Sequence, residues 1–143
     1  AYNEAGRSDE SDKAFDKALE LDPDNATTLN NHAYYLSLRH TQLEKAERMS
    51  RRSNELAPGQ SSFQDTYAWV LFQLGRYSDA REWIEKAVQS GGAASGEVLE
   101  HYGDILYRAG DAEGALLKWK EAQRLGGASD AIGRKVAEGR LPD

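Results

Sequence analysis

The sequence contains no cysteine, which excludes disulfides, thiolate metal ligands and a thiol nucleophile. It has no stretch approaching the roughly 18 consecutive apolar residues that a membrane-spanning helix needs, and no charged start followed by a short apolar run marks a secretion signal. We therefore expect no membrane insertion of this segment. The net charge is −6, with 18 lysines and arginines against 24 aspartates and glutamates. This balance argues against a nucleic-acid partner, because clustered basic side chains would be needed to neutralise phosphates.

Sequence signatures of catalysis and metal binding are also missing. The three histidines, His32, His40 and His101, form no HxxxH or HExxH pair, which favours structural or solvated histidines over a zinc site. The serines form no GxSxG elbow or SxxK pair, so nucleophilic catalysis has no support. The glycine-rich residues 90–96 lack the lysine of a phosphate-binding loop. We therefore expect no enzymatic activity, no cofactor and no metal.

What the sequence does contain is an internal repeat with a period near 35 residues. Small residues recur at this spacing in three series: Ala33, Ala68 and Gly103; Ser11, Ala46, Ala80 and Ala115; Ala18, Ser53, Ala87 and Ala122. Small side chains at such positions let two helices approach closely, because a bulky side chain would hold the backbones apart. The period therefore predicts a series of similar helical units.

Glycine and proline positions, together with the spacing of apolar residues, predict the internal structure of each unit. Gly75 and Gly110 lie in the middle of their units and predict turns, with Gly6 in the matching place of the first unit. Pro23 and Pro58 end the first two units, since proline stops a helix. Apolar residues share one helical face within a unit, and no alternating strand pattern competes. Each unit is thus a helix, a short turn and a second helix, which buries its apolar face by stacking on its neighbours.

Two runs of residues carry a resemblance to a known family. They contain Tyr67, Ala68, Leu71, Gly75, Arg76, Tyr77 and Ala80, and then Tyr102, Gly103, Leu106, Gly110, Asp111, Ala115, Trp119 and Ala122. In this spacing the chain resembles tetratricopeptide repeats over about residues 1–128, and residues 30–36 and 65–69 resemble repeat proteins of bacteria in particular.

The resemblance implies an all-α fold, a right-handed superhelical solenoid of antiparallel helix pairs. It divides the chain into a truncated repeat 1 (residues 1–25), repeat 2 (26–60), repeat 3 (61–94), repeat 4 (95–128), and a C-terminal capping helix and tail (129–143).

The two ends differ from complete units. A turn at Gly6 would leave only residues 1–5 for a first helix, so we expect a fragment of a longer protein. Tyr2 would then lack part of its packing surface, and the exposed start would favour association with a second copy. Residues 129–139 predict a terminal cap. The cap would turn Ile132 and Val136 inward and Arg134, Lys135 and Glu138 outward.

The first helices of successive units predict a binding groove, because stacked helix pairs curve and expose an inner surface. When the residues expected in the core are set aside, each first helix keeps one stripe of residues, and the stripes recur at a 35-residue step. They are Asn30, Tyr34 and Ser37; Asp65, Trp69 and Phe72; and Glu100, Asp104 and Tyr107. Aromatic residues on such a face are favoured binding anchors. The alternative is that Tyr34 and Trp69 pack on the neighbouring helix. The predicted peptide-binding residues are Asn30, Asn31, Tyr34, Asp65, Trp69, Phe72, Glu100, His101, Asp104 and Tyr107.

The expected partner follows from the charges on this face. Some members of the family that the chain resembles hold the carboxylate terminus of chaperones with Lys, Arg and Asn. Here the corresponding places hold no lysine; they are filled by Thr27, Asn30, Asn31, Tyr34, Asp65, Trp69, Glu97 and His101. The far end is acidic, with Arg108 as the expected nearest opposing charge. We therefore expect a protein or peptide partner with an apolar or basic segment.

These features lead to one main hypothesis about function and one alternative. The main hypothesis is a non-catalytic scaffold for protein–protein interaction that binds a peptide or protein segment in the concave groove. The alternative is a structural module through which copies of a larger bacterial protein associate, with a homodimer formed through the truncated N-terminal end.

Overall fold

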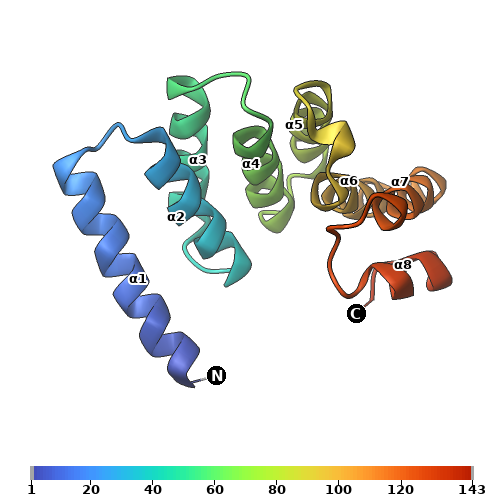
Figure 1. Ribbon diagram of the computed structural model, residues 1–143, viewed down its shortest axis with the longest axis horizontal. Helices are drawn as coiled ribbons and strands as arrows, with labels where there is room; N and C mark the ends of the chain where they lie inside the picture. The colour runs from blue at the N-terminus through green and yellow to red at the C-terminus, as the bar shows by residue number, and fades with distance from the viewer. Residues whose placement is uncertain (1, 143) are drawn as a thin grey trace.

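The computed structural model describes the backbone of residues 2–142 and the side chains of residues 12–142. This part of the chain is helical and contains no strand. Its elements are α1 (Tyr2–Leu21), α2 (Ala26–Leu38), α3 (Leu43–Leu56), α4 (Ser61–Gln73), α5 (Tyr77–Gln89), the short 3-10 helix η1 (Gly92–Ala94), α6 (Gly96–Arg108), α7 (Ala112–Leu125) and α8 (Ile132–Glu138) (Figure 1). None of the described helices is long and apolar enough to cross a membrane.

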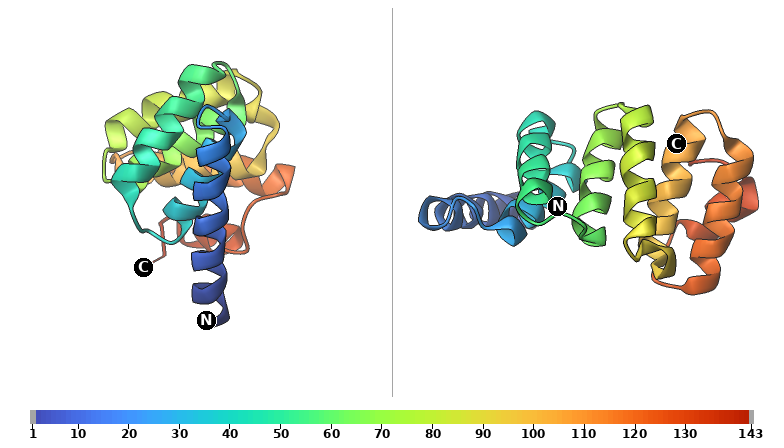
Figure 2. Two further views of the ribbon diagram at one scale, coloured as in Figure 1. Left: turned by 90° about the vertical axis from the view of Figure 1, so that its left-hand side faces the viewer. Right: turned by 90° about the horizontal axis from the view of Figure 1, so that it is seen from above.

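The helices pack as consecutive pairs that stack side by side in chain order (Figure 2). The pairs are α2 with α3, α4 with α5, and α6 with α7, and each second helix also packs on the first helix of the next pair. The first helices touch one another as well, α2 on α4 and α4 on α6. The expected all-helical solenoid is therefore confirmed. It places α2, α4 and α6 next to each other on one face.

Local sequence signals explain where several of these helices begin and turn. The Asn25 side chain accepts a hydrogen bond from the Thr28 amide at 2.9 Å and caps α2. Gly75 and Gly110 have φ of +80° and +97°, as a turn between two helices requires. The linker of residues 39–42 is one residue longer than those of residues 74–76 and 109–111, and it places His40 at a φ of +51°.

The recurring small residues lie where helices meet. The described alanines of the three series are fully buried, apart from Ala18, which is half-buried. Gly103 shows such a constraint directly, because an added Cβ would lie 2.4 Å from Cδ1 of Trp119 on α7. The small side chains thus permit the helix contacts that their spacing predicts.

The turn expected at Gly6 is wrong, because α1 runs without interruption from Tyr2 to Leu21. A single glycine costs a helix only about 1 kcal/mol, and Gly6 is flanked by the good helix formers Ala5 and Arg7, so nothing forces the chain to turn there. Among the described elements α1 packs on α2, and it leans away from the rest of the stack (Figure 1). The side chain of Tyr2 lies outside the described residues, so the expectation about its packing stays a prediction.

The C-terminal helix agrees with its prediction except at one residue. Ile132 and Val136 pack inward against Trp119, and Arg134 and Glu138 are exposed, as expected. Lys135 was expected to point outward, which is wrong: its side chain is 7% exposed. The cause is an ion pair with acidic side chains of α6, described below.

Candidate functional site

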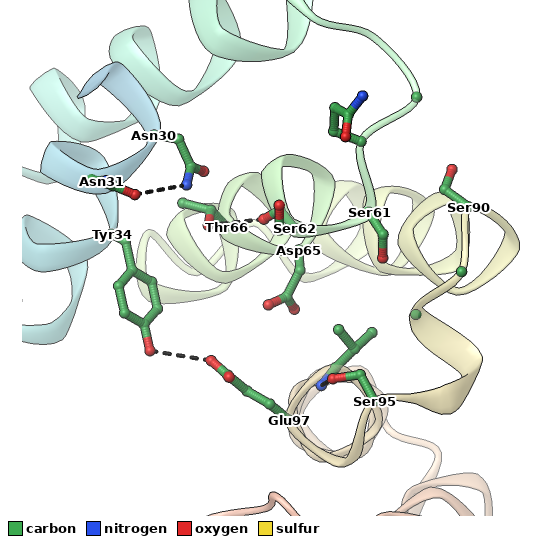
Figure 3. Close-up of a pocket in the computed structure, with 15 residues that line it drawn as sticks. Asn30, Asn31, Tyr34, Ser61, Ser62, Asp65, Thr66, Ser90, Ser95 and Glu97 are labelled. Carbon is green, nitrogen blue, oxygen red and sulfur yellow. Dashed lines mark hydrogen bonds between the residues drawn. The ribbon is translucent and has the colours of Figure 1, made fainter. Parts of the chain in front are cut away.

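Two adjacent hollows lie on the face formed by α2, α4 and α6. We call this face the groove. The first hollow has a volume of about 540 Å³, and its walls include Asn30, Asn31, Tyr34, Asp65 and Glu97 (Figure 3). Loop residues of the α3–α4 and α5–α6 connections close one side of it.

The second hollow has a volume of about 410 Å³ and shares Tyr34 and Glu97 with the first. Its other walls include Trp69 of α4, His101 of α6, and Ser129 and Lys135 of the C-terminal segment. Tyr34 and Glu97 therefore stand at the junction of the two hollows, where the Tyr34 hydroxyl donates a hydrogen bond to Glu97 Oε1 at 3.2 Å (Figure 3).

Eight of the ten predicted peptide-binding residues line these hollows. They are Asn30, Asn31, Tyr34, Asp65, Trp69, Glu100, His101 and Asp104. The other two, Phe72 and Tyr107, line neither hollow. Phe72 packs against the core with its ring 5.6 Å from that of Tyr77, and the Tyr107 ring lies 5.8 Å from Trp119. The 35-residue step placed them on the right helices, but the Tyr107 ring lies against α7, and the Phe72 ring lies between Tyr77 of α5 and Trp69 of α4, 4.9 Å from the Trp69 ring.

Two polar atoms in the groove have no hydrogen-bond partner among the described residues. Asn30 is 8% exposed, and its Nδ2 donates to Asn31 at 3.4 Å while its Oδ1 accepts nothing. The Trp69 Nε1 likewise donates to no acceptor. A buried polar group without a partner costs free energy, and a peptide bond offers both the donor and the acceptor that these two atoms lack.

Asp65 and His101 join α4 to α6 across the groove. His101 Nδ1 lies 2.8 Å from Asp65 Oδ1, and the His101 ring stacks on Trp69 with 4.1 Å between centroids. Burial on its own lowers the pKa of His101, but the nearby carboxylates, Asp65 first, outweigh it and raise the pKa above the usual 6.5. Burial and the Glu97 carboxylate also raise the pKa of Tyr34 to about 12. This half of the groove is therefore electronegative.

One group of two carboxylates and an imidazole could hold a metal ion. One ligand atom from each of Asp65, Glu97 and His101 lies within 4.8 Å of the other two. We expected no metal site, because no histidine pair shared a helix; this trio draws on two helices, so a motif search along the sequence does not find it.

Glu100 and Asp104 form a second acidic pair, which already contacts a cation of the chain. Lys135 Nζ lies 2.7 Å from Glu100 Oε2 and 3.0 Å from Asp104 Oδ1, and Ser129 donates its amide and hydroxyl to Glu100 at 2.7 and 2.6 Å. Burial would raise the pKa of Glu100, but the bonds from Lys135 and Ser129 outweigh it and lower the pKa. For Asp104 burial prevails, and the pKa is raised despite Lys135.

Lys135, not Arg108, is therefore the opposing charge of the acidic end, which corrects the expectation from sequence. Arg108 lies over the Tyr107 ring instead, 5.9 Å from its centroid. A signal for Lys135 was present, since Asn30, Asp65, Glu100 and Lys135 follow one another at the 35-residue repeat step. The capping helix thus supplies the next member of the inner-face series.

Stacked helix pairs with a hollowed inner face define the class of α-solenoid repeat proteins. A family model described as tetratricopeptide repeat matches residues 1–125, and the chain belongs to this family. The TPR repeat-containing protein PA4667 of Pseudomonas aeruginosa is 29% identical over 83 residues, which are 58% of this chain and 14% of that protein. The bacterial type expected from the sequence is confirmed by this relative.

Solved structures show the same fold. TTC0263, a thermophilic TPR protein of Thermus thermophilus, matches with a TM-score of 0.79 and 13% identity, covering 95% of this chain and 74% of that one. The first TPR of Spaghetti (RPAP3), bound to the HSP90 peptide SRMEEVD, matches with a TM-score of 0.71 and 12% identity, covering 80% of this chain and 89% of that one. These likenesses establish the fold alone.

Proposed function

We propose that this chain is a non-catalytic protein-interaction scaffold that holds a peptide segment of a partner in the groove. The observation that carries the proposal is the pair of adjoining hollows along α2, α4 and α6, with Asn30 Oδ1 and Trp69 Nε1 unpartnered in their walls. An extended segment laid across both hollows would contact their walls, and rotation of the Asn30 and Trp69 side chains would bring these two enclosed atoms within reach of its backbone.

The charges of the groove favour an apolar or basic segment. The HSP90 peptide in the RPAP3 structure carries three acidic residues in SRMEEVD. A comparable acidic peptide would meet the carboxylates of Asp65 and Glu97 here, and like charges brought together in an interface are costly. Trp69 and Tyr34 supply the aromatic surface that an apolar anchor would contact.

The arrangement of polar groups supports a non-catalytic role. A histidine paired with a carboxylate, as His101 is with Asp65, is half of a nucleophilic site and needs a hydroxyl or thiol beside it. Ser129 lines the same hollow, but its hydroxyl donates to Glu100 at 2.6 Å and not to His101.

A capture experiment with matched variants tests the proposal. The chain and a Tyr34→Ala, Trp69→Ala double variant would be immobilised and exposed to a bacterial lysate after circular dichroism has shown that both are folded. We expect partners that the double variant fails to capture. Leu117→Ala is the control, because Leu117 is a large apolar residue that is 67% exposed and lines neither hollow. Equal capture by the chain and the double variant would move the binding site away from the groove.

Self-association is the second candidate function. Two large apolar side chains outside the hollows are exposed at the α1–α2 end of the array, namely Leu21 and Tyr35. Apolar surface of this kind favours contact with a second copy. Sedimentation velocity over a hundredfold range of concentration tests it: a mass that rises with concentration, and does so less in a Leu21→Ser, Tyr35→Ser variant, would support self-association through this end.

A further inference from the structure

We propose that the half of the groove lined by Asp65 and Glu97 binds a lysine or arginine side chain of the partner, so that the segment is anchored by a cation. The inference rests on the proposed function, and it specifies the chemistry of one position in the bound segment.

The chain itself contains an example of a cation bound by two carboxylates next to this pair. Lys135 is seated on Glu100 and Asp104 with all three side chains less than a tenth exposed. Glu97 lies one helical turn before Glu100 on α6, so the two acidic positions adjoin along one helix. Asp65 stands one repeat before Glu100, on α4. The two carboxylate pairs are therefore neighbours, because Glu97 and Glu100 adjoin on α6.

The Asp65 and Glu97 pair has no lysine or arginine partner within residues 12–142. Asp65 takes the hydrogen bond of His101, and Glu97 takes that of the Tyr34 hydroxyl. No lysine or arginine of this part of the chain forms an ion pair with either. This pair therefore lacks the kind of cation that Glu100 and Asp104 have in Lys135.

The surroundings of the pair suit a donor-rich cation. Asn30 lines the same hollow, and its buried Oδ1 has no donor. The Tyr34 ring also lines it and offers a face to a cation (Figure 3). A guanidinium or ammonium group carries three or more N–H donors and no acceptor, which matches a wall of two carboxylates and an amide oxygen.

Selection from a phage-displayed library of random dodecapeptides tests the inference. The library would be selected on the chain in EDTA, and in parallel on a Glu97→Gln variant and on the Tyr34→Ala, Trp69→Ala variant. We expect lysine or arginine to be enriched at one position of the peptides selected by the chain. The affinity of a selected peptide should fall about tenfold or more when that residue becomes norleucine, or when Glu97 becomes Gln, because a charge-assisted hydrogen bond is lost. Glu97 is exposed, so the Gln variant should fold like the parent.

The outcomes separate this inference from the proposed function. Peptides that need Tyr34 and Trp69 but show no basic enrichment, or that bind the Glu97→Gln variant equally well, would overturn the inference and leave the groove intact. If the selected peptides bind all of these variants as well as the parent chain, or if the selection yields no peptide, both the inference and the proposed function would be overturned.

A metal ion held by Asp65, Glu97 and His101 is the competing occupant of this site, and a titration tests for it. Zn²⁺ or Mn²⁺ added alone would be followed by calorimetry. Micromolar binding that is lost in His101→Gln, together with displacement of the basic peptide by the ion, would overturn the inference in favour of a metal site. Absence of metal binding would support the basic side chain as the occupant.

Discussion

Lys135 of α8 and Glu100 of α6 are joined by a 2.7 Å ion pair in which both side chains are almost fully buried. Together with Ser129, which donates two hydrogen bonds to Glu100, this contact seats the C-terminal segment against the inner face. The same residues form a wall of the second hollow. The capping helix therefore closes the hydrophobic stack and shapes the groove as well.

Removing the lysine should destabilise the fold strongly. In Lys135→Met the carboxylates of Glu100 and Asp104 stay buried without their cation, and breaking such a pair from one side costs about 3 to 5 kcal/mol. Urea unfolding followed by circular dichroism measures the change. Arg134→Met on the same helix is the matched control, because its partner Glu138 is exposed and the pair contributes little. Equal midpoints for the two variants would show that the Lys135 contacts do not stabilise the fold.

A methyl group at position 103 should be poorly tolerated. In Gly103→Ala the new Cβ would lie 2.4 Å from Trp119 Cδ1 and Nε1, and the ring must move away from its 3.0 Å hydrogen bond to Asp104. We expect a loss of about 1 to 3 kcal/mol of unfolding free energy. Gly133→Ala is the control, since its Cβ would meet only Gln123 Nε2 at 3.9 Å, and alanine there should leave stability unchanged or raise it by up to about 1 kcal/mol. Thermal melts of both variants would contradict this reasoning if Gly103→Ala proved the more stable.

His40 occupies the turn position that glycine fills in the later units. The His40 amide bonds to Ser37 O at 3.1 Å, as the Gly75 amide bonds to Phe72 O at 3.0 Å, and both residues have positive φ. Because a left-handed backbone strains a residue with a Cβ, His40→Gly should stabilise the chain by up to about 1 kcal/mol. Thr41→Gly, next to it but without a positive φ, should instead destabilise. Denaturation curves of the two variants measure the change, and a loss of stability in His40→Gly would show that the hydrogen bond between His40 Nδ1 and Gln73 Oε1 outweighs the strain.

Stability should depend on pH through His101. The folded-state pKa of His101 is raised by Asp65 and the other nearby carboxylates, although burial opposes them. A raised pKa means that the folded state binds the proton more tightly, so the stabilisation is fully present below the unfolded-state pKa near 6.5 and is lost as pH rises through the folded-state pKa. The difference in unfolding free energy between the chain and His101→Gln should therefore shrink from pH 6 to pH 9. A difference that stays constant or grows with pH would contradict the pairing.

Much of the fold could be predicted from the sequence because its determinants are local and periodic. The 35-residue recurrence of small residues marks where helices meet, and Gly75, Gly110 and Pro58 mark where they turn. Eight of the ten groove residues line the hollows for the same reason, since position within the repeat fixes which helix face a residue occupies. The wrong prediction of a turn at Gly6 has a local cause too. One glycine only weakens a helix, and no second sequence signal marks a turn there.

The sequence by itself thus determined the helices, their order and the face that becomes the groove. Only the tertiary structure decided how side chains on that face are used. Lys135 is buried on Glu100, the Tyr107 ring packs near Trp119 of α7, and the Phe72 ring packs between Trp69 and Tyr77. The trio of Asp65, Glu97 and His101 forms only when α4 and α6 lie side by side. The physical reason is that periodicity specifies the direction of a side chain from its helix, whereas charge pairing and desolvation depend on which atoms of other helices that side chain meets.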